Sequence, residues 1–305
     1  MREKGYKMKK QKFKQLSFSD KVITICGGIG LLLFVLAIII PLAYVVIASF
    51  MDPTELNNNG ISLNFSKWSL DGYERIFKDN MLIRGLLNSI FYSTTFAIIS
   101  VGATLLAAYP LSKPDFVGKK FITTLYVITM FFGGGLMPTY LLVDRLNILN
   151  TVWAILLPGA INVWNIILAR TYFQSLPKEL REASAIDGAS DITHFFKIML
   201  PICKPIIAVL VLYQFVAQWN SYFDAMIYLD DANLQPLQLV IRSILIQNAP
   251  RPGMISDIQS TAAMAKVAEL LKYSTIVVSS LPLLVMYPFF QKYFDKGIMA
   301  GSVKG

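Results

Sequence analysis

The chain has 305 residues, of which 55% are hydrophobic and only 15% are charged, and its formal net charge is +9. A soluble domain of this length usually has about 25% charged residues, so the composition excludes a wholly water-exposed globule and indicates an integral membrane protein. The excess of Lys and Arg fits cytoplasmic loops better than nucleic-acid binding, because no basic stripe interleaved with aromatic residues lies outside the apolar segments.

Six apolar segments are long enough to cross a bilayer as helices, which takes about 20 residues. A basic tail, 1–21, precedes the first segment, which has Pro41 as its expected kink and no small-residue cleavage site, so we expect it to remain as an anchor. The sequence thus predicts an all-α integral membrane fold, with a six-helix domain over 22–295 and a C-terminal tail over 296–305. The segments are 22–50, 87–111, 121–143, 148–172, 205–229 and 273–290.

The distribution of Lys and Arg predicts the orientation of these segments. With the N-terminus inside, nineteen of the 28 Lys and Arg residues fall on the cytoplasmic side, where membrane proteins concentrate them. An even number of crossings then places both termini in the cytoplasm. Within the third segment, Gly133–Gly135 permits either close helix packing or a local unwinding that lines a cavity, and both alternatives stay open.

The loop over 177–205, between the fourth and fifth segments, is predicted to be cytoplasmic. A short helix starts near Pro177, since proline suits the first turn of a helix. Gly188 follows, where a chain leaving a helix commonly needs a positive φ. A second amphipathic piece ends just before the next crossing, and its apolar residues are expected on one side: Ile192, Phe195, Phe196, Ile198 and Met199.

This loop resembles the signature of permease subunits of binding-protein-dependent ATP-binding-cassette (ABC) importers: Glu-Ala-Ala, three residues, Gly, nine residues, Ile, one residue, Leu-Pro. Serine replaces the second alanine here. Trp219–Leu229 and Lys296–Gly305 resemble the sugar-specific branch, which includes the smaller permease of maltose-type transporters. The resemblance covers the chain from about Val22 onward, and it implies the type I importer permease fold with a coupling helix seated on an ATPase subunit. The residues expected to couple to the ATPase are Glu182, Ala183, Ser184, Ala185, Gly188, Ile198, Leu200 and Pro201.

Physical chemistry supports such a contact independently. Glu182 can accept a charge-assisted hydrogen bond from a partner Arg or Lys, worth about 1.5–3 kcal/mol. Gly188 would turn the chain so that motion of the docked helix reaches the fifth crossing. The alternative is an ordinary amphipathic loop helix that lies on lipid headgroups.

Polar residues in the fourth and fifth segments form a candidate translocation path, because polar groups at membrane depth normally face a bundle interior or a wet cavity. In the fifth segment they are spaced four, three and three residues apart, which predicts one helical face. The alternative is hydrogen bonding between helices, worth about 0.6 kcal/mol each, with Asp224 at the outer interface. The candidates are Asn162, Asn165, Gln214, Gln218, Trp219, Asn220, Ser221 and Asp224.

Catalytic groups are scarce. The two cysteines, Cys26 and Cys203, lie at or within apolar segments, which argues against a disulfide or a metal site. The single histidine, His194, is expected to be solvated or at an interface rather than catalytic. The chain has no G-x-x-x-x-G-K-[ST] loop, so we expect it to bind no cofactor and to leave ATP and Mg²⁺ to partner ATPase subunits.

The resemblance also implies what is carried and with whom. The expected solute is a carbohydrate, above all an oligosaccharide, imported through a bacterial cytoplasmic membrane. The expected partners are a second homologous permease, two ATPase subunits, an extracellular solute-binding protein and membrane lipid, without nucleic acid. Open alternatives are a non-sugar solute in the same importer class and a secondary transporter. The tail residues expected to contact the ATPase are Gly301, Ser302, Val303, Lys304 and Gly305.

Overall fold

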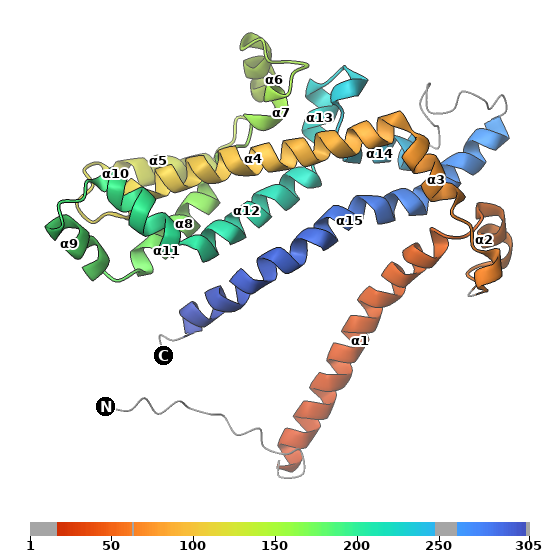
Figure 1. Ribbon diagram of the computed structural model, residues 1–305, viewed down its shortest axis with the longest axis horizontal. Coiled ribbons are helices and arrows are strands. Elements are labelled where there is room, and N and C mark those ends of the chain that lie inside the picture. Colours follow the sequence, from red (N-terminus) through yellow and green to blue (C-terminus); the bar gives the residue numbers. More distant parts are fainter. Residues whose placement is uncertain (1–16, 63, 248–260, 303–305) are drawn as a thin grey trace.

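The computed structural model describes residues 17–62, 64–247 and 261–302, and it is an elongated array of helices (Figure 1). Within these ranges no strand forms, apart from an isolated bridge between Met51 and Trp68. The all-α prediction is confirmed. In chain order the elements are α1 (Phe18–Ala48), α2 (Pro53–Asn59), η2 (Phe65–Lys67), α3 (Asp71–Lys78), α4 (Asn80–Ser112), α5 (Lys119–Phe131), α6 (Leu136–Arg145), α7 (Trp153–Leu156), α8 (Val163–Ser175), α9 (Glu179–Ile186), α10 (Asp191–Thr193), η3 (His194–Met199), α11 (Leu200–Ile202), α12 (Lys204–Trp219), α13 (Phe223–Tyr228), η4 (Ala232–Leu234), α14 (Leu237–Gln247) and α15 (Thr261–Ser302).

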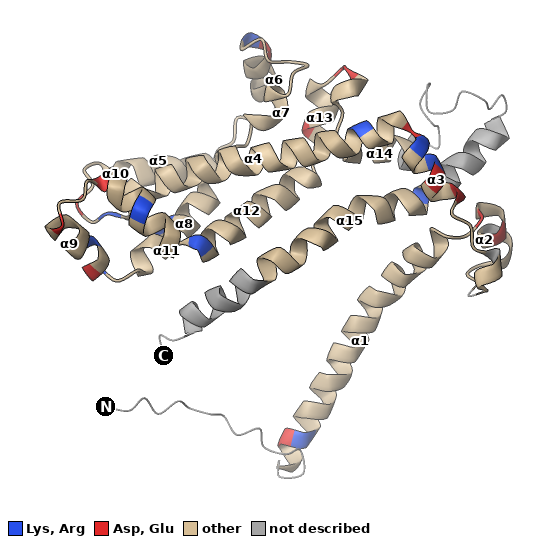
Figure 2. Ribbon diagram, in the orientation of Figure 1, with Lys and Arg blue, Asp and Glu red and all other residues tan. Residues whose placement is uncertain are grey.

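Three helical stretches are long and apolar enough to cross a membrane: α1, α4 and residues Leu271–Gln291 of α15. Two more crossings result if each of two bent pairs counts as one span, which gives up to five in the described part of the chain. The first pair is α5 with α6, bent by 113°, and the second is Asp191–Ile202 with α12, bent by 79°. Charged residues gather near the ends of the long helices and in the connecting segments (Figure 2), as membrane spans require.

The third predicted segment, 121–143, is not one helix. It breaks between α5 and α6 at Gly133–Gly135, where Gly135 has a φ of 81°. Each glycine costs about 1 kcal/mol in a helix interior relative to alanine, so three in succession favour a break. Pro138 then fits the first turn of α6, where its missing N–H is not needed. The unwinding of the second alternative is therefore present in the structure, and the cavity that it was expected to line stays a prediction.

The fourth and fifth predicted segments are also wrong as continuous helices. Within 148–172, the short α7 and the 13-residue α8 are separated by a turn at Pro158 and Gly159, whose φ is 75°. A Pro-Gly pair ends a helix because proline has no N–H and glycine accepts the left-handed backbone. Within 205–229, the chain leaves helical geometry between α12 and α13.

The C-terminal helix is longer than predicted. The sixth segment, 273–290, lies inside α15, which continues to Ser302. The first part of the predicted tail over 296–305 is therefore helical, and Gly301 and Ser302 are the last two residues of α15. Side chains beyond Gln291 are not described, and Val303, Lys304 and Gly305 lie outside the described residues, as do residues 1–16 of the basic tail.

Helix α4 is the centre of the packed array and contacts α8, α12 and α14 (Figure 1). Small side chains allow these close approaches, as membrane helices require when no hydrophobic force drives them together. Ala108 is fully buried in one cluster with Ala169 of α8 and Leu210 of α12. At the other end of α4, a Cβ added to Gly85 would lie 3.2 Å from the Cα atom of Leu237 in α14.

Helix α1 stands apart from this core, joined to it at one end (Figure 1). Of its 31 residues only Ala48, the last, is buried. It contacts α15 and otherwise exposes its apolar side chains over most of its length. It continues as a helix through Pro41, the predicted kink.

Candidate functional site

The short helix α9 projects beyond the ends of α4 and α8 (Figure 1). It begins at Glu179, two residues after Pro177, and ends in a Schellman turn. The N–H of Ala189 donates to the carbonyl oxygen of Ser184 at 2.9 Å, and the N–H of Gly188 donates to that of Ala185 at 3.1 Å. Gly188 has a φ of 71°, so the predicted positive φ is confirmed.

One face of α9 is open and the other is packed on the chain's own loop. Glu182, Ala183 and Ala185 are exposed, and Ile186 is 87% exposed. Ser184 is buried instead. The exposed face therefore presents the carboxylates of Glu179 and Glu182 beside small and apolar side chains, and Ser184 does not belong to it.

His194 lies under α9. Its Nδ1 atom is 2.8 Å from the Ser184 hydroxyl, and its ring packs near that of Tyr109 with centroids 6.2 Å apart. The hydroxyl of Ser184 also lies 2.8 Å from the carbonyl oxygen of Arg181, to which it donates. Of the two expectations for His194, solvated or at an interface, the solvated one is wrong, because the ring is buried against Ser184 of α9 and Tyr109 of α4.

The segment after α9 does not have a single apolar side. It is helical from α10 through α11, but its middle, η3, is a π-helix in which the N–H of Leu200 donates to the carbonyl oxygen of Phe195. This wider winding shifts the register of the following side chains. Phe195 and Met199 are buried, whereas Ile192 and Phe196 are exposed. Of the remaining predicted residues, Ile198 and Leu200 are partly buried and Pro201 is exposed.

Two ion pairs fasten this loop to the end of α4. Arg181 Nη2 lies 2.8 Å from Asp115 Oδ2, and Lys113 Nζ lies 2.5 Å from Asp191 Oδ1. We call these four residues the clasp. The hydrogen bond from Arg181 holds the pKa of the Asp115 carboxyl below its usual value. Lys113 also sits 4.7 Å from the ring centroid of Tyr109.

The clasp was not predicted from the sequence. Its available signal was opposite charge in two loops predicted on the same side of the membrane, 113–120 and 177–205. That signal gives no pairing, because which carboxylate meets which cation depends on the turn geometry at the end of α4.

The predicted polar stripe does not survive as one helical face, because the chain leaves helical geometry between Trp219 and Phe223. Gln214 is buried and hydrogen bonds to Ser100 of α4. Gln218 lies one turn later, partly buried, whereas Ser221 lies within the break and Asp224 follows it in α13. Gln214 thus links α12 to α4 by a hydrogen bond, which is the alternative to lining a translocation path.

The remaining candidates also hydrogen bond within the chain. The indole Nε1 of Trp219 donates to the carbonyl oxygen of Ser279 in α15 at 3.2 Å, and the ring is buried. The exposed Asn220 donates to the carbonyl oxygen of Val216 at 2.9 Å. In the fourth segment, Asn162 caps α8 by accepting from the N–H of Asn165, which is buried.

A second set of contacts that the sequence did not predict holds the segment before α14 against α4. Asn88 Nδ2 donates to the carbonyl oxygens of Asn233 and Gln235, at 2.8 and 3.0 Å. The Tyr92 hydroxyl donates to the carbonyl oxygen of Leu234 at 2.8 Å. Asn88 and Tyr92 thus hold a loop near the start of α4, just as the clasp holds α9 near its end.

The apolar helices, with a small exposed helix clasped to the end of a long one, form the kind of array expected of a multi-pass membrane protein. A family described as "Binding-protein-dependent transport system inner membrane component" matches residues 11–300, and the chain belongs to it. It is a multi-pass membrane permease of an ABC importer, and it works with other components of that transporter.

Individual relatives agree over nearly their whole lengths. The chain is 38% identical to the polygalacturonan/rhamnogalacturonan transport system permease protein YtcP of Bacillus subtilis, over 90% of this chain and 96% of that protein. It is 30% identical to the arabinooligosaccharides transport system permease protein AraQ of Halalkalibacterium halodurans, over 91% and 95%. The crystal structure of a bacterial ABC transporter involved in the import of the acidic polysaccharide alginate contains a chain that matches with a TM-score of 0.82 and 28% identity, over 92% of this chain and 99% of that chain.

Proposed function

We propose that this permease imports a carbohydrate, most simply an oligosaccharide, and that α9 is its coupling helix. The observation that carries the coupling role is the exposed face of α9, with Glu182, Ala183, Ala185 and Ile186, backed by the clasp. Because the clasp fixes α9 to the end of α4, a partner docked on the exposed face can move α9 without deforming the loop. The names of the similar permeases, which concern polygalacturonan, rhamnogalacturonan and arabinooligosaccharides, support a carbohydrate substrate.

The proposed assembly contains a second permease, two cytoplasmic ATPase subunits that hold ATP and Mg²⁺, and an extracellular solute-binding protein. The apolar side chains along α1, which its own chain leaves exposed, support a partner helix or lipid beside it. The excess of Lys and Arg in the loops on one side supports a bacterial cytoplasmic membrane location with both termini in the cytoplasm.

In this mechanism, closure of the ATPase subunits moves α9. The clasp passes that motion to α4, and the helical run from α10 to α11 passes it to α12. Because α4 and α12 pack together, both would move as one body and shift the permease between inward-open and outward-open states.

The test is Glu182→Ala in the assembled importer. We expect lower uptake and weaker retention of the ATPase subunits on purification, with normal membrane insertion, because the partner loses one charge-assisted hydrogen bond of about 1.5–3 kcal/mol. Asp187→Ala, which removes an exposed carboxylate from the end of the same helix, is the matched control. Full ATPase retention and uptake in Glu182→Ala would refute the coupling role.

The substrate class needs a separate assay. The importer, reconstituted with its solute-binding protein, should show ATPase stimulation by an acidic or neutral oligosaccharide from a glycan panel. Stimulation by amino acids, peptides or ions but by no glycan would support the alternative of a non-sugar solute.

A further inference from the structure

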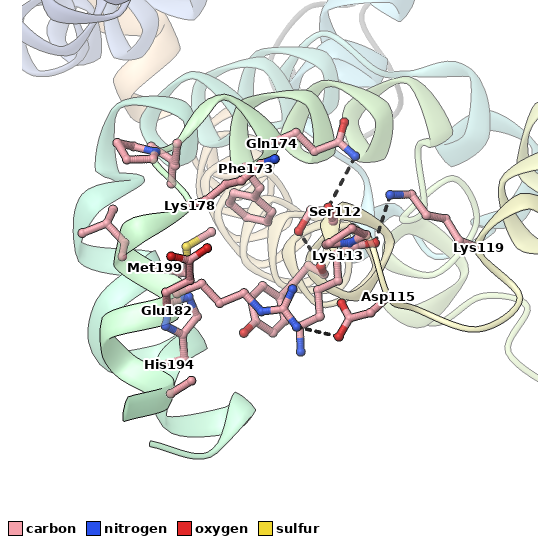
Figure 3. Close-up of a pocket in the computed structure, with 17 residues that line it drawn as sticks. Ser112, Lys113, Asp115, Lys119, Phe173, Gln174, Lys178, Glu182, His194 and Met199 are labelled. Carbon is pink, nitrogen blue, oxygen red and sulfur yellow. Dashed lines mark hydrogen bonds and ion pairs between the residues drawn. The ribbon is translucent and has the colours of Figure 1, made fainter. Parts of the chain in front are cut away.

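A cavity of about 580 Å³ lies between α9 and the ends of α4 and α8 (Figure 3). Helix α9 and the residue before it contribute Lys178, Arg181 and Glu182, and the ends of the other two helices contribute Ser112 and Gln174. Of the predicted coupling residues, only Glu182 and Ala185 reach the lining. The proposed contact with the ATPase therefore does not account for this space.

The lining carries more positive than negative groups, with four cationic side chains and two carboxylates. Arg181 and Lys113 are already engaged in the clasp. Lys119 Nζ donates to the carbonyl oxygen of Lys113 at 3.0 Å, and Lys178 forms no ion pair with any described residue. Because an ammonium group has three donors, both lysines keep N–H groups for an anion.

The rest of the lining is largely apolar. Phe173, Leu176, Leu180 and Met199 contribute hydrocarbon surface beside the charged groups. A small hydrated anion would leave this surface without a partner, whereas a purely apolar ligand would leave the ammonium groups unused. The cavity also lies where α4, which is long and apolar enough to cross a membrane, and α8, which packs against it, come to an end. Basic pockets between helices on the cytoplasmic side of membrane proteins bind anionic headgroups.

We propose that this cavity binds a phosphate ester attached to an apolar chain, with Lys119 and Lys178 as its cationic contacts. The expected source is the headgroup of an anionic phospholipid, and a free phosphate compound is the other source of the same chemistry. A bound ligand would touch α9, α4 and α8 together and so brace the coupling helix. That consequence rests on the proposed coupling role, whereas the binding itself does not.

The test measures lipid retention by native mass spectrometry on the assembled importer, purified in phosphatidylcholine and titrated with phosphatidylglycerol. We compare Lys119→Gln/Lys178→Gln with the control Lys120→Gln/Lys204→Gln, whose two exposed lysines lie outside the cavity but remove the same charge. Each lysine near an anionic headgroup contributes about 1 kcal/mol to binding. Lys119→Gln/Lys178→Gln should therefore bind one phosphatidylglycerol with an affinity about 30-fold lower than the unmodified importer does. The control should bind as the unmodified importer does.

Competition with inorganic phosphate and with glycerol 3-phosphate separates the two sources. If neither displaces phosphatidylglycerol at matched concentration, the ligand is a lipid. If both displace it equally well, the lipid assignment is overturned and a free phosphate compound occupies the site. Equal phosphatidylglycerol retention by both double variants overturns the proposal altogether. Because retention is measured without transport, a failure here leaves the result of Glu182→Ala untouched.

Discussion

The turn at Gly188 permits a quantitative test of how α9 is held. A Cβ added to Gly188 would meet no atom within 4 Å, so any cost of substitution comes from the backbone and not from a steric clash. At a φ of 71° an L-residue is strained by about 1–2 kcal/mol, asparagine by less, and a β-branched residue by more. The expected order of damage is therefore Gly188→Asn, then Gly188→Ala, then Gly188→Val.

Hydrogen exchange at the amide of Ala189 measures this strain directly, because that amide donates to Ser184 only when the turn is formed. At 1.4 kcal/mol for each factor of ten, Gly188→Ala should reduce its protection about 5- to 30-fold, with Gly188→Val lower still. Uptake by the assembled importer should fall in the same order, while ATPase retention changes less. Equal protection in the asparagine and valine variants would refute the argument from φ.

Three further substitutions test other contacts. Arg181→Asp should lower uptake with little loss of stability, since the pair with Asp115 is partly exposed and such pairs contribute little to folding. Adding Asp115→Arg should restore uptake, and a double variant no better than Arg181→Asp would remove the clasp from the mechanism. Gly85→Ala should lower the thermal midpoint in detergent by an amount that corresponds to about 1–3 kcal/mol, because the new methyl group presses on the backbone of Leu237, and an unchanged midpoint would contradict that packing. Gln218→Leu should change uptake or specificity if that side chain lines the solute path, and unchanged transport assigns it to packing.

Local chemistry decided which parts of the fold could be predicted. Gly188 was predictable because only one backbone region suits the residue after a helix that ends in this way, and glycine is the residue that enters it without strain. The all-α architecture was predictable because long apolar segments have no other way to satisfy their backbone in lipid.

The breaks within helices were harder to predict. Gly133–Gly135 and Pro158–Gly159 are strong local signals for a break, yet each lies inside an apolar segment long enough to cross a membrane as one helix. The break after Trp219 has neither proline nor glycine, and the residue before it makes a tertiary contact that no local pattern indicates, the hydrogen bond from its indole to the carbonyl oxygen of Ser279. The stripe prediction failed there because spacing places residues on one face only while the helix continues.

In the candidate site, too, features set by neighbouring residues were predictable and contacts between distant residues were not. The identity of α9 came from residues within one loop, whereas the clasp joins Lys113 and Asp115 to residues 66 or more positions away in the chain. Ser184 shows the limit most clearly. Its replacement of alanine is small, but its hydroxyl meets His194, and no pattern within the loop indicates that contact.

The isolation of α1 has a consequence for biogenesis. It precedes the other spans in this sequence and is the most apolar of the three long ones, and only Ala48 of its residues is buried among the described parts of the chain, so it can remain in the bilayer while the later helices are synthesised. Helix α4 is less apolar and much more buried, and it reaches its final surroundings only after α8 and α12 have been made. A newly made subunit should therefore insert α1 early and complete the packing of α4 late. A copy that never meets its partners would keep the apolar side chains of α1 exposed to membrane proteases.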